Sequence, residues 1–389
     1  MIPRQSASLA RTLAREFKIV AIIGPRQAGK TTLAREVFAD RPYVSLEAPD
    51  DLQFARDDPR RFLAQYDQGA VIDEAQRCPE LFSYLQGIVD SRKEPGQFVL
   101  TGSQHFGLME RLTQSLAGRV GFLRLLPFSL AELAKAGRVP ESLDGMLFQG
   151  GYPPLYDQPV VPERWLDAYL TTYVERDVRQ LVNVRDLGAF QRFVRLCAGS
   201  IGRLVNLSRI GSNAGIDQKT VSSWLGILES SFIVFRLQPH HRNFRKRLVK
   251  SPKLYFYDVA LAVRLLGVDA ADQIATHPLR GELFENWVVS ELLKGRSVRG
   301  KSDNLCFWRS HVGHEVDVVA EHANSLMPVD VKSGATIAAD WFDALDRWVE
   351  LAGAVAENPT LVYGGDRRQS RRNIDVLPWR KVASLAKQI

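Results

Sequence analysis

Cysteine is scarce in this sequence, and long apolar runs are missing. The 389 residues include three cysteines, Cys78, Cys197 and Cys306, which lie far apart and form no C-x-x-C pair. This spacing argues against a disulfide framework and a zinc ribbon, so we expect a reducing compartment, the cytoplasm. No run of about 18 apolar residues occurs, and residues 1–17 lack the apolar stretch of a signal peptide. We therefore expect no membrane span and no membrane partner.

Positive charge, by contrast, is concentrated in one part of the chain. The net charge is +7, but residues 185–253 alone hold 13 Lys and Arg against three acids. Such a basic middle predicts a surface for a polyanion, nucleic acid in particular, although a solvated basic face has the same composition. With 45% apolar and 24% charged residues, the chain is long enough for two or three packed domains.

A phosphate-binding loop is predicted near the N-terminus. Residues 18–23 form an apolar run typical of a buried parallel strand, and residues 33–38 are typical of a helix. The segment between them matches G-x-x-x-x-G-K-[ST] and consists of Gly24, Pro25, Arg26, Gln27, Ala28, Gly29, Lys30, Thr31 and Thr32. In such a loop, backbone N–H groups and the helix N-terminus bind phosphates. We expect Lys30 to bridge the β- and γ-phosphates of ATP and Thr31 to bind Mg²⁺.

A second strand ends in two carboxylates that would complete this site. Residues 69–74 (GAVIDE) are an apolar run ending in Asp73 and Glu74. We expect Asp73 to hold the magnesium ion from the end of a neighbouring strand. Glu74 would then orient or deprotonate the water that attacks the γ-phosphate. A surface turn after a strand is the alternative.

Two further segments supply candidate sensors of the nucleotide. Residues 97–104 (QFVLTGSQ) read as a strand whose polar end, Ser103 and Gln104, would contact the γ-phosphate or position water. The same residues would also suit a polar strand end without function. Arg119 is a candidate arginine finger or sensor, or an ordinary exposed arginine after a helix.

Several sequence blocks resemble one family of proteins. They are GPRQAGKTT at 24–32, AVIDEAQ at 70–76, LTGSQ at 100–104, SLAGRV at 115–120, LPFSLAEL at 126–133, GGYP at 150–153 and YVERDVRQL at 173–181. These blocks resemble bacterial and archaeal AAA-type ATPases that are usually described only as ATP-binding proteins. The resemblance implies ATP hydrolysis in an AAA-like core followed by a small helical region. AAA-type cores often assemble so that the arginine of one subunit completes the site of another, and the resemblance leaves such a homo-oligomer open.

The sequence pattern in the basic middle of the chain is typical of a helix-turn-helix. We expect a short helix after a cap at Ser208, a turn at 214–215 and a second helix after a cap at Asp217. The exposed face of the second helix would carry three polar residues that a nucleic-acid groove could meet, Gln218, Lys219 and Ser222.

Two strands after these helices would complete a winged helix. We expect them at 231–237 and 253–257, with a basic loop at 240–250 as the wing. The loop residues expected to contact phosphates are Arg242, Arg245, Lys246, Arg247 and Lys250. The partner of this module is nucleic acid or, as the alternative, a protein.

The last third predicts an α/β domain like that of restriction nucleases. Glu285 lies on an expected helix, Asp317 on the strand 315–320, and Asp330 and Lys332 on the strand that follows. This region resembles the domain of unknown function that follows the same ATPase family, which is similar to PD-(D/E)xK nucleases. The resemblance implies that Asp317 and Asp330, with Glu285, hold Mg²⁺ or Mn²⁺. Lys332 would stabilise the pentavalent phosphate or activate water.

The sequence thus predicts an α/β protein in four parts. They are a P-loop AAA-like ATPase core at 1–135, a helical lid or linker at 136–186, a winged helix-turn-helix at 187–257 and a restriction-nuclease-like α/β domain at 258–389. Two functions stay open at this stage. One is an ATPase that contacts nucleic acid and has a metal-dependent nuclease tail. The other is an antitoxin-like regulatory or signalling ATPase, a DNA- or protein-binding switch, whose tail is catalytically inactive.

Overall fold

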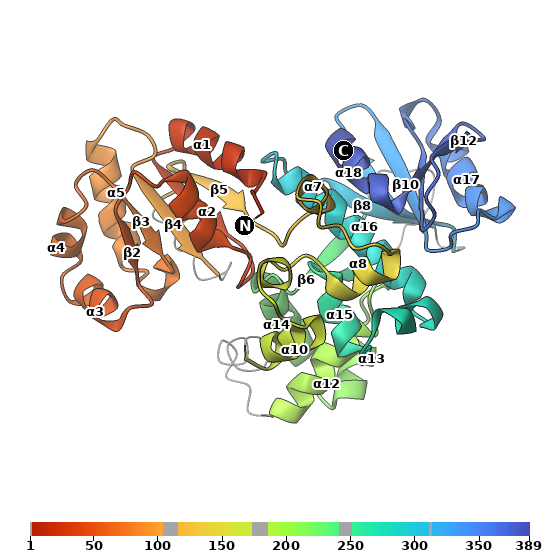
Figure 1. The fold of residues 1–389 in the computed structure, drawn as a ribbon, viewed down its shortest axis with the longest axis horizontal. Helices are drawn as coiled ribbons and strands as arrows, with labels where there is room; N and C mark the ends of the chain where they lie inside the picture. The colour runs from red at the N-terminus through yellow and green to blue at the C-terminus, as the bar shows by residue number, and fades with distance from the viewer. Residues whose placement is uncertain (1, 104–115, 173–185, 241–250, 311–312) are drawn as a thin grey trace. The chain divides into compact units, whose positions relative to one another are not determined.

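The computed structural model describes residues 2–103, 116–172, 186–240, 251–310 and 313–389 (Figure 1). The expected site residues Gln104, Arg242, Arg245, Lys246, Arg247 and Lys250 lie outside these ranges. The chain forms two compact units. The first comprises Met1–Phe128 with Ser230–Phe232 and Ser297–Lys301, and the second comprises Ser129–Glu229, Ile233–Arg296 and Ser302–Ile389.

The first unit is built on a five-stranded sheet in which every pair of neighbouring strands is parallel, in the order β2-β3-β4-β1-β5. Its strands are β1 (Ile19–Ile23), β2 (Tyr43–Ser45), β3 (Ala70–Asp73), β4 (Phe98–Gly102) and β5 (Val120–Arg124). Its helices are α1 (Ser6–Glu16), α2 (Lys30–Val37), α3 (Pro49–Asp57), α4 (Pro59–Ala64) and α5 (Leu81–Ser91), with a 3₁₀ turn at Ala75–Arg77.

The apolar runs of the central strands explain why they lie inside. All residues of β1, β3 and β4 are buried, as expected of parallel strands that are covered on both faces. Val20 and Ile22 of β1 pack with Leu33 of α2 and Leu13 of α1 in one apolar cluster. This packing fixes the start of α2 beside the end of β1, where the predicted phosphate loop connects the two elements.

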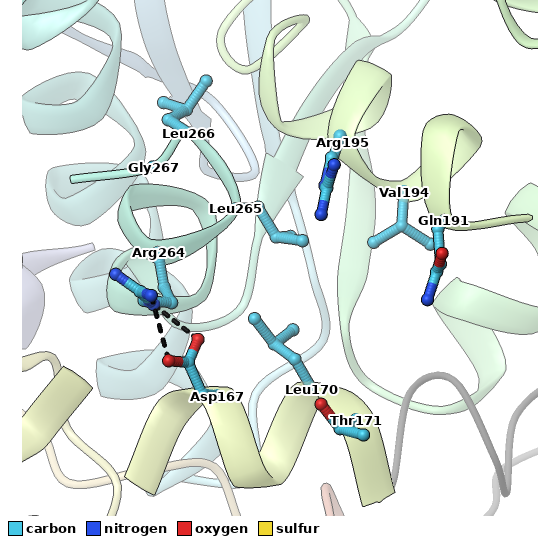
Figure 2. Close-up of a pocket in the computed structure, with 10 residues that line it drawn as sticks. All are labelled: Asp167, Leu170, Thr171, Gln191, Val194, Arg195, Arg264, Leu265, Leu266 and Gly267. Carbon is cyan, nitrogen blue, oxygen red and sulfur yellow. Dashed lines mark hydrogen bonds and ion pairs between the residues drawn. The ribbon is translucent and has the colours of Figure 1, made fainter. Parts of the chain in front are cut away.

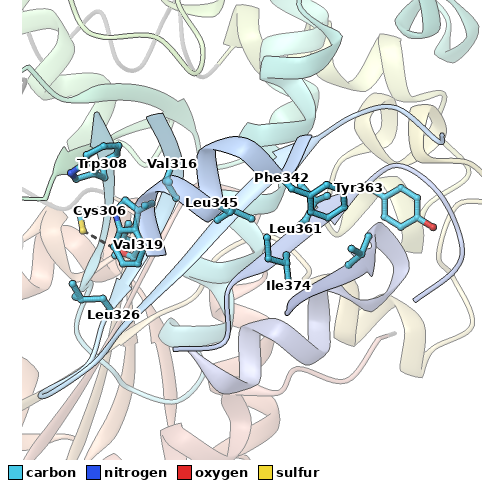
Figure 3. Close-up of a cluster of buried hydrophobic side chains, with 12 residues drawn as sticks. Cys306, Trp308, Val316, Val319, Leu326, Phe342, Leu345, Leu361, Tyr363 and Ile374 are labelled. Atoms are coloured by element: carbon cyan, nitrogen blue, oxygen red, sulfur yellow. Dashed lines mark hydrogen bonds between the residues drawn. The ribbon is translucent and has the colours of Figure 1, made fainter. Parts of the chain in front are cut away.

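The second unit contains a mixed eight-stranded sheet in the order β12-β13-β11-β10-β9-β8-β6-β7. The strands are β6 (Val234–Pro239), β7 (Lys253–Phe256), β8 (Leu305–Arg309), β9 (Glu315–Glu321), β10 (Leu326–Lys332), β11 (Thr360–Tyr363), β12 (Gln369–Arg371) and β13 (Ile374–Pro378). A helix, α17 (Asp343–Ala352), places Leu345 and Trp348 in a buried cluster with strand residues such as Val319 and Leu361 (Figure 3). An α/β fold is therefore present in both halves of the chain.

The part of the second unit before β8 is mostly helical. The helices are α7 (Leu130–Lys135), α8 (Leu143–Gln149), α9 (Pro154–Asp157), α10 (Pro162–Tyr169), α12 (Leu187–Ala198), α13 (Leu207–Ala214), α14 (Gln218–Ser230) and α15 (Val259–Leu265). Later come α16 (Arg280–Ser297) and α18 (Val382–Gln388), and 3₁₀ turns lie at Ala271–Thr276, Ala339–Phe342, Gly353–Val355 and Trp379–Lys381. Among the described helices, none combines the length and the apolar character needed to cross a bilayer.

The expected helix-turn-helix segment contains two helices joined by a tight turn. The first helix, α13, is capped by Asn206, whose side chain accepts from Arg209 N at 2.9 Å, so the cap expected at Ser208 is wrong by two positions. Gly215 ends α13 in the left-handed conformation. Asp217 Oδ1 accepts from Lys219 N at 2.8 Å and therefore caps the start of α14 as predicted.

The two strands expected as a wing belong to the large sheet. β6 and β7 pair in antiparallel fashion, but Gln238 and Pro239 of β6 also pair with Cys306 and Phe307 of β8. The expected boundary at 257–258 lies between strands of a single sheet, and the two compact units divide near Phe128. The winged helix and the four-part division stay predictions.

Candidate nucleotide site and a buried charge cluster

The loop at 24–32 has the backbone that a phosphate-binding loop needs. A Cβ atom on Gly24 would lie 2.0 Å from the carbonyl oxygen of Leu125, so only glycine fits against the neighbouring strand end. Gly29 has φ +87° and directly precedes Lys30, the first residue of α2. The loop therefore leads from β1 into a helix N-terminus, which is a favourable place for an anion.

Lys30 is held inside this loop. Its side chain is buried, and Nζ donates to the carbonyl oxygen of Pro25 at 2.9 Å. Burial lowers the pKa of Lys30 to about 8, against the opposing effect of the acids Glu74 and Asp73. The ammonium thus contacts a backbone carbonyl of the loop that was predicted to bind the phosphates.

Asp73 lies beside Thr31, as the magnesium prediction requires. Thr31 Oγ1 is 3.0 and 3.1 Å from the two carboxylate oxygens of Asp73. The strands are not neighbours, however, because β4 lies between β1 and β3. Thr101 of β4 and Tyr43 of β2 donate to the same carboxylate, the latter at 2.9 Å. Burial and Asp73 together raise the pKa of Tyr43 to about 12, so the phenol stays a donor.

This oxygen-rich arrangement fits a magnesium ion. A hydroxyl and a carboxylate are ligands that Mg²⁺ accepts, and it usually keeps several waters besides. Thr31 and Asp73 provide one of each at the end of the sheet where the phosphate loop lies. The residues present are therefore those that would hold Mg²⁺ next to a bound triphosphate.

Glu74 and Ser103 come together at the same end of the sheet. Ser103 Oγ donates to Glu74 Oε1 at 2.8 Å, and Gln76 Nε2 donates to the other carboxylate oxygen. Glu74 has φ +53°, a left-handed conformation that costs a non-glycine residue on the order of 1–3 kcal/mol. The structure thus places the candidate base and one of the two candidate sensors in direct contact.

Arg119 lies at the other end of the sheet from the phosphate loop. Its carbonyl accepts from Ile19 N at the start of β1, whereas the loop follows Ile23 at the end of that strand. A five-residue strand separates the two ends by about 13–16 Å. The side chain forms a bidentate ion pair with Asp90, with Nη2 to Oδ2 at 2.8 Å. Arg119 therefore lies far from the phosphate loop of its own chain, and its role as arginine finger or sensor stays a prediction.

Arg4 supports the phosphate loop and was not predicted from the sequence. Its Nη1 donates to the carbonyl of Ala28 at 2.8 Å and its Nη2 to the carbonyl of Leu126 at 2.5 Å. The guanidinium also lies 4.8 Å from the centre of the Phe128 ring. Arg4 thereby ties the loop to the segment after β5. An arginine ahead of the first helix carries no sequence signal for such a role.

The second unit gathers the acids that were predicted for a nuclease-like site. Asp317 of β9 and Asp330 of β10 lie on neighbouring strands, and Asp317 Oδ2 accepts from Val331 N at 2.9 Å. Lys332 forms an ion pair with Asp330. Glu285 of α16 and Asp317 both contact the ammonium of Lys253. All four predicted residues thus belong to one cluster.

Lys253 of β7 occupies the centre of this cluster. Its Nζ lies 2.8 Å from Glu285 Oε1 and 3.6 Å from Asp317 Oδ1, and it also pairs with Glu315. The side chain is only 2% exposed. A lysine in an expected wing strand looked like a surface charge in the sequence, which is why the prediction missed it.

The pKa values of the cluster follow from burial and this internal ammonium. Burial, with the charge of Asp317 second, raises the pKa of Glu285 to about 7. Burial also raises the pKa of Asp330, next to the Asp317 charge. Burial also acts to raise the pKa of Asp317, but Lys253 and Lys332 together hold that pKa below its usual value. For Lys253, burial is outweighed by Tyr255 and the acids, so its pKa lies well above the usual value.

A divalent metal ion does not fit this cluster with Lys253 in place. A metal would need the oxygens of Glu285 and Asp317 that the ammonium already contacts. The ion and the ammonium would therefore compete for the same ligands, and two cations at such a separation repel each other strongly. The expected Mg²⁺ or Mn²⁺ at this site is not supported by the arrangement.

A groove with a volume of about 780 Å³ opens beside the cluster. Its lining includes Arg203, Arg209, Arg309, Gln218, Lys253 and Glu285. The predicted contact residues Gln218, Lys219 and Ser222 are all exposed on α14, and the first of them lines this groove. Two of the arginines are paired with acids, Arg203 with Glu282 at 2.8 Å and Arg309 with Glu315 at 3.1 Å.

Another cavity, of about 510 Å³, lies among α10, α12 and α15 (Figure 2). In its lining, Arg264 of α15 forms a bidentate ion pair with Asp167 of α10, with Nη2 to Oδ2 at 2.9 Å. Leu170, Val194 and Leu265 add apolar surface to the lining. The residues predicted as site residues from the sequence do not line this cavity.

Comparison with known proteins divides the chain into three matched segments. The AAA domain family matches residues 16–134. Two domains of unknown function match the remainder, DUF8612 at residues 140–272 and DUF4143 at residues 280–382. The last of these segments contains Glu285, Asp317, Asp330 and Lys332.

Two mycobacterial relatives cover most of the chain. The uncharacterised proteins Mb2031c of Mycobacterium bovis and Rv2008c of Mycobacterium tuberculosis are each 30% identical over 336 residues, 86% of this chain and 74% of theirs. Among solved structures, a Walker-type ATPase of Pyrococcus abyssi is 16% identical with a TM-score of 0.46, and the match covers 68% of this chain and 96% of that protein.

Proposed function

Because the chain belongs to the AAA-type P-loop ATPases, in one family with the uncharacterised mycobacterial protein Rv2008c, we propose that its first unit binds and hydrolyses Mg²⁺-ATP. The observation that carries this proposal is the contact of Thr31 with Asp73 beside a loop that encloses the Lys30 ammonium. A bound Mg²⁺ would neutralise charge on the phosphates and orient them for attack.

Each residue of this site has a chemical task. Lys30 leaves the carbonyl of Pro25 and pairs with the terminal phosphates, which offer a stronger partner than a neutral oxygen. The backbone N–H groups between Gly24 and Lys30 bind the remaining phosphate oxygens. Glu74 accepts a proton from the water that attacks the γ-phosphorus, while the bond from phosphorus to the bridging oxygen of ADP breaks. Ser103, which contacts Glu74, positions that carboxylate.

Phosphate release measured with Lys30→Ala and Lys18→Ala tests this proposal. Lys18 lies at the opposite end of β1 and donates to the carbonyl of Arg92 at 2.6 Å, so it is a matched lysine outside the site. We expect Lys30→Ala to abolish Mg²⁺-dependent turnover and Lys18→Ala to retain it. Equal turnover in both variants would overturn the proposal.

A second function is favoured by the groove in the second unit. We propose that this groove binds nucleic acid and that ATP binding or hydrolysis controls the binding. Support comes from the three arginines along it and from Gln218 at the start of α14. The basic composition of residues 185–253 points the same way. A protein partner in the same groove is the alternative outcome of the test.

Salt-dependent binding of a labelled DNA or RNA duplex separates these outcomes. Arg209 lines the groove and is exposed, while Arg368 is exposed and paired with Asp375 at 2.9 Å in a hairpin at the far edge of the sheet from β7. We expect Arg209→Ala to weaken binding and to reduce the log–log salt slope by about 0.9, one phosphate contact. Arg368→Ala should leave the slope unchanged. A groove that binds protein would show no change with either variant.

We propose further that the tail does not cleave nucleic acid. The support is Lys253, whose ammonium contacts the carboxylates that a nuclease would give to its metal. Purified protein incubated with Mg²⁺ or Mn²⁺ should therefore leave DNA and RNA intact. Metal-dependent cleavage that disappears in Asp317→Ala would restore the nuclease function implied by the sequence.

A further inference from the structure

Three residues on neighbouring strands of the large sheet bring metal-binding atoms together, apart from the cluster around Lys253. His240 directly follows β6, Cys306 lies on β8, and Glu321 is the last residue of β9. His240 and Cys306 are buried, whereas the Glu321 side chain is 36% exposed. In the described part of the chain this is the one group of three such side chains whose ligand atoms lie within 4.8 Å of one another.

The distances among these atoms are close to those around a tetrahedral metal ion. Cys306 Sγ lies 3.7 Å from His240 Nδ1 and 3.6 Å from Glu321 Oε1. Metal bonds of about 2.0–2.3 Å at a tetrahedral angle place two ligand atoms about 3.3–3.6 Å apart. The third edge, from Nδ1 to Oε1, is a hydrogen bond of 2.7 Å and must lengthen when an ion enters. Only the distance between Nδ1 and Oε1 therefore has to change by more than a few tenths of an ångström.

Backbone hydrogen bonds hold the three positions in register. His240 N donates to the carbonyl of Phe307 at 2.7 Å, and Glu321 N donates to the carbonyl of Asn304 at 3.0 Å. Cys306 pairs with Val319 on β9, and its Sγ lies 3.3 Å from the Val319 carbonyl, to which the thiol donates (Figure 3). Because the ligands come from rigid strands, little ordering is needed when they bind an ion.

We propose that His240, Cys306 and Glu321 bind one divalent transition-metal ion of the zinc class. A thiolate selects soft or borderline ions such as Zn²⁺ over Mg²⁺ or Ca²⁺. One thiolate, one carboxylate and a neutral imidazole around a divalent ion sum to zero charge, which suits a largely buried site. A water would take the fourth position on the exposed side, where Glu321 meets solvent.

Binding of the ion changes the protonation of Cys306. The thiol gives up its proton to solvent, its donation to the Val319 carbonyl ends, and a sulfur–metal bond forms. Burial raises the pKa of this thiol, so without a metal it stays uncharged and does not act as a nucleophile. The ion would link β6, β8 and β9, three neighbouring strands of the large sheet.

Cobalt titration of the metal-stripped full-length protein tests the proposal. Co²⁺ replaces zinc in such sites and reports a thiolate ligand by a charge-transfer band and tetrahedral geometry by visible bands. We expect one equivalent of Co²⁺ with both features, and one equivalent of zinc by elemental analysis of the protein after zinc loading and removal of the excess. Cys306→Ser should abolish the charge-transfer band, whereas Cys197→Ser, which removes another buried cysteine, should keep it.

A second variant keeps the test decisive if Cys306→Ser fails to fold. Glu321→Gln alters a partly exposed carboxylate and should lower the affinity for Co²⁺ at least about 10-fold while the thiolate band remains at saturation. Absence of the band in the unaltered protein would overturn the proposal, because the trio would then be only a hydrogen-bonded group. A band that survives in Cys306→Ser, or metal content equal in all variants, would show adventitious binding and overturn it equally.

Discussion

Thr31 Oγ1 lies 3.0 Å from Asp73 Oδ1, although the strands next to these residues are separated by β4. Thr101, on that intervening strand, donates to the same carboxylate. The contact thus spans three strands, and it places a hydroxyl and a carboxylate where a magnesium ion beside the phosphate loop would need them. The proposed ATPase rests on this arrangement.

Asp73→Asn should uncouple the site from magnesium. The amide has nearly the same shape but carries no charge, so it holds a divalent ion weakly. We expect Mg²⁺-dependent ATP turnover to fall by about two orders of magnitude, as when an electrostatic contact to the transition state is removed. Asp90→Asn, which removes a carboxylate at the other end of the sheet, should retain turnover in a phosphate-release assay. Equal losses in both variants would contradict the assignment of Asp73.

Glu74→Gln should separate binding from hydrolysis. Its carboxylate contacts Ser103 and lies outside the loop that holds the phosphates, so the nucleotide still binds. A general base contributes about 10²–10⁴-fold, and we expect turnover to drop within that range. Titration with a fluorescent ATP analogue and single-turnover phosphate release measure the two steps. An unchanged rate would remove Glu74 from the mechanism.

Gly24→Ala should disrupt the phosphate loop, although the substitution adds only one methyl group. The added Cβ would meet the carbonyl oxygen of Leu125 at 2.0 Å, so backbone on one side must move. We expect loss of nucleotide binding and a free energy of unfolding lowered by about 1–3 kcal/mol. Gly226→Ala in α14 is the matched control, because nothing lies within 4 Å of its Cβ position. That change should stabilise the helix by about 0.5–1 kcal/mol in chemical denaturation.

Lys253→Met should convert an internal ion cluster into a metal site. Removal of the ammonium leaves Glu285, Glu315 and Asp317 without their shared cation. We expect the free energy of unfolding to fall by about 3–5 kcal/mol, with part of the loss restored by Mn²⁺. Lys219→Met, at an exposed position, serves as the control. Its free energy of unfolding should stay unchanged, both without and with Mn²⁺. If the unaltered protein binds Mn²⁺ at this cluster as tightly as the variant, the ammonium does not block the site.

The sequence alone was informative where a local pattern dictates the structure. The strand, glycine loop and helix around Lys30 form as predicted, because the motif contains its own turn residues and N-terminus. The order of Glu285, Asp317, Asp330 and Lys332 along the chain was also sufficient to predict that they converge. Residues on successive elements of one sheet are brought together by short connections.

The remaining features depend on contacts between distant segments. Lys253 looked like a wing charge because nothing near it in sequence shows that β7 packs against α16 with its acids. The pairing of β6 with β8 joins residues 238 and 306, and no local pattern encodes such a register. The same pairing creates the trio of His240, Cys306 and Glu321 from three separate strands. The motif around Arg119 likewise does not tell that this residue lies at the end of the sheet away from the phosphate loop.

Calorimetric titration of Mg²⁺-ATP into the full-length protein and its Lys30→Ala and Lys18→Ala variants tests the central claim most directly. The ammonium of Lys30 lies inside the loop at 24–32 and donates to the carbonyl of Pro25. We predict that Lys30→Ala lowers the affinity at least about 10-fold, since a charge-assisted contact to phosphate contributes about 1.5–3 kcal/mol, whereas Lys18→Ala leaves it unchanged. The same affinity in all three proteins would contradict the account.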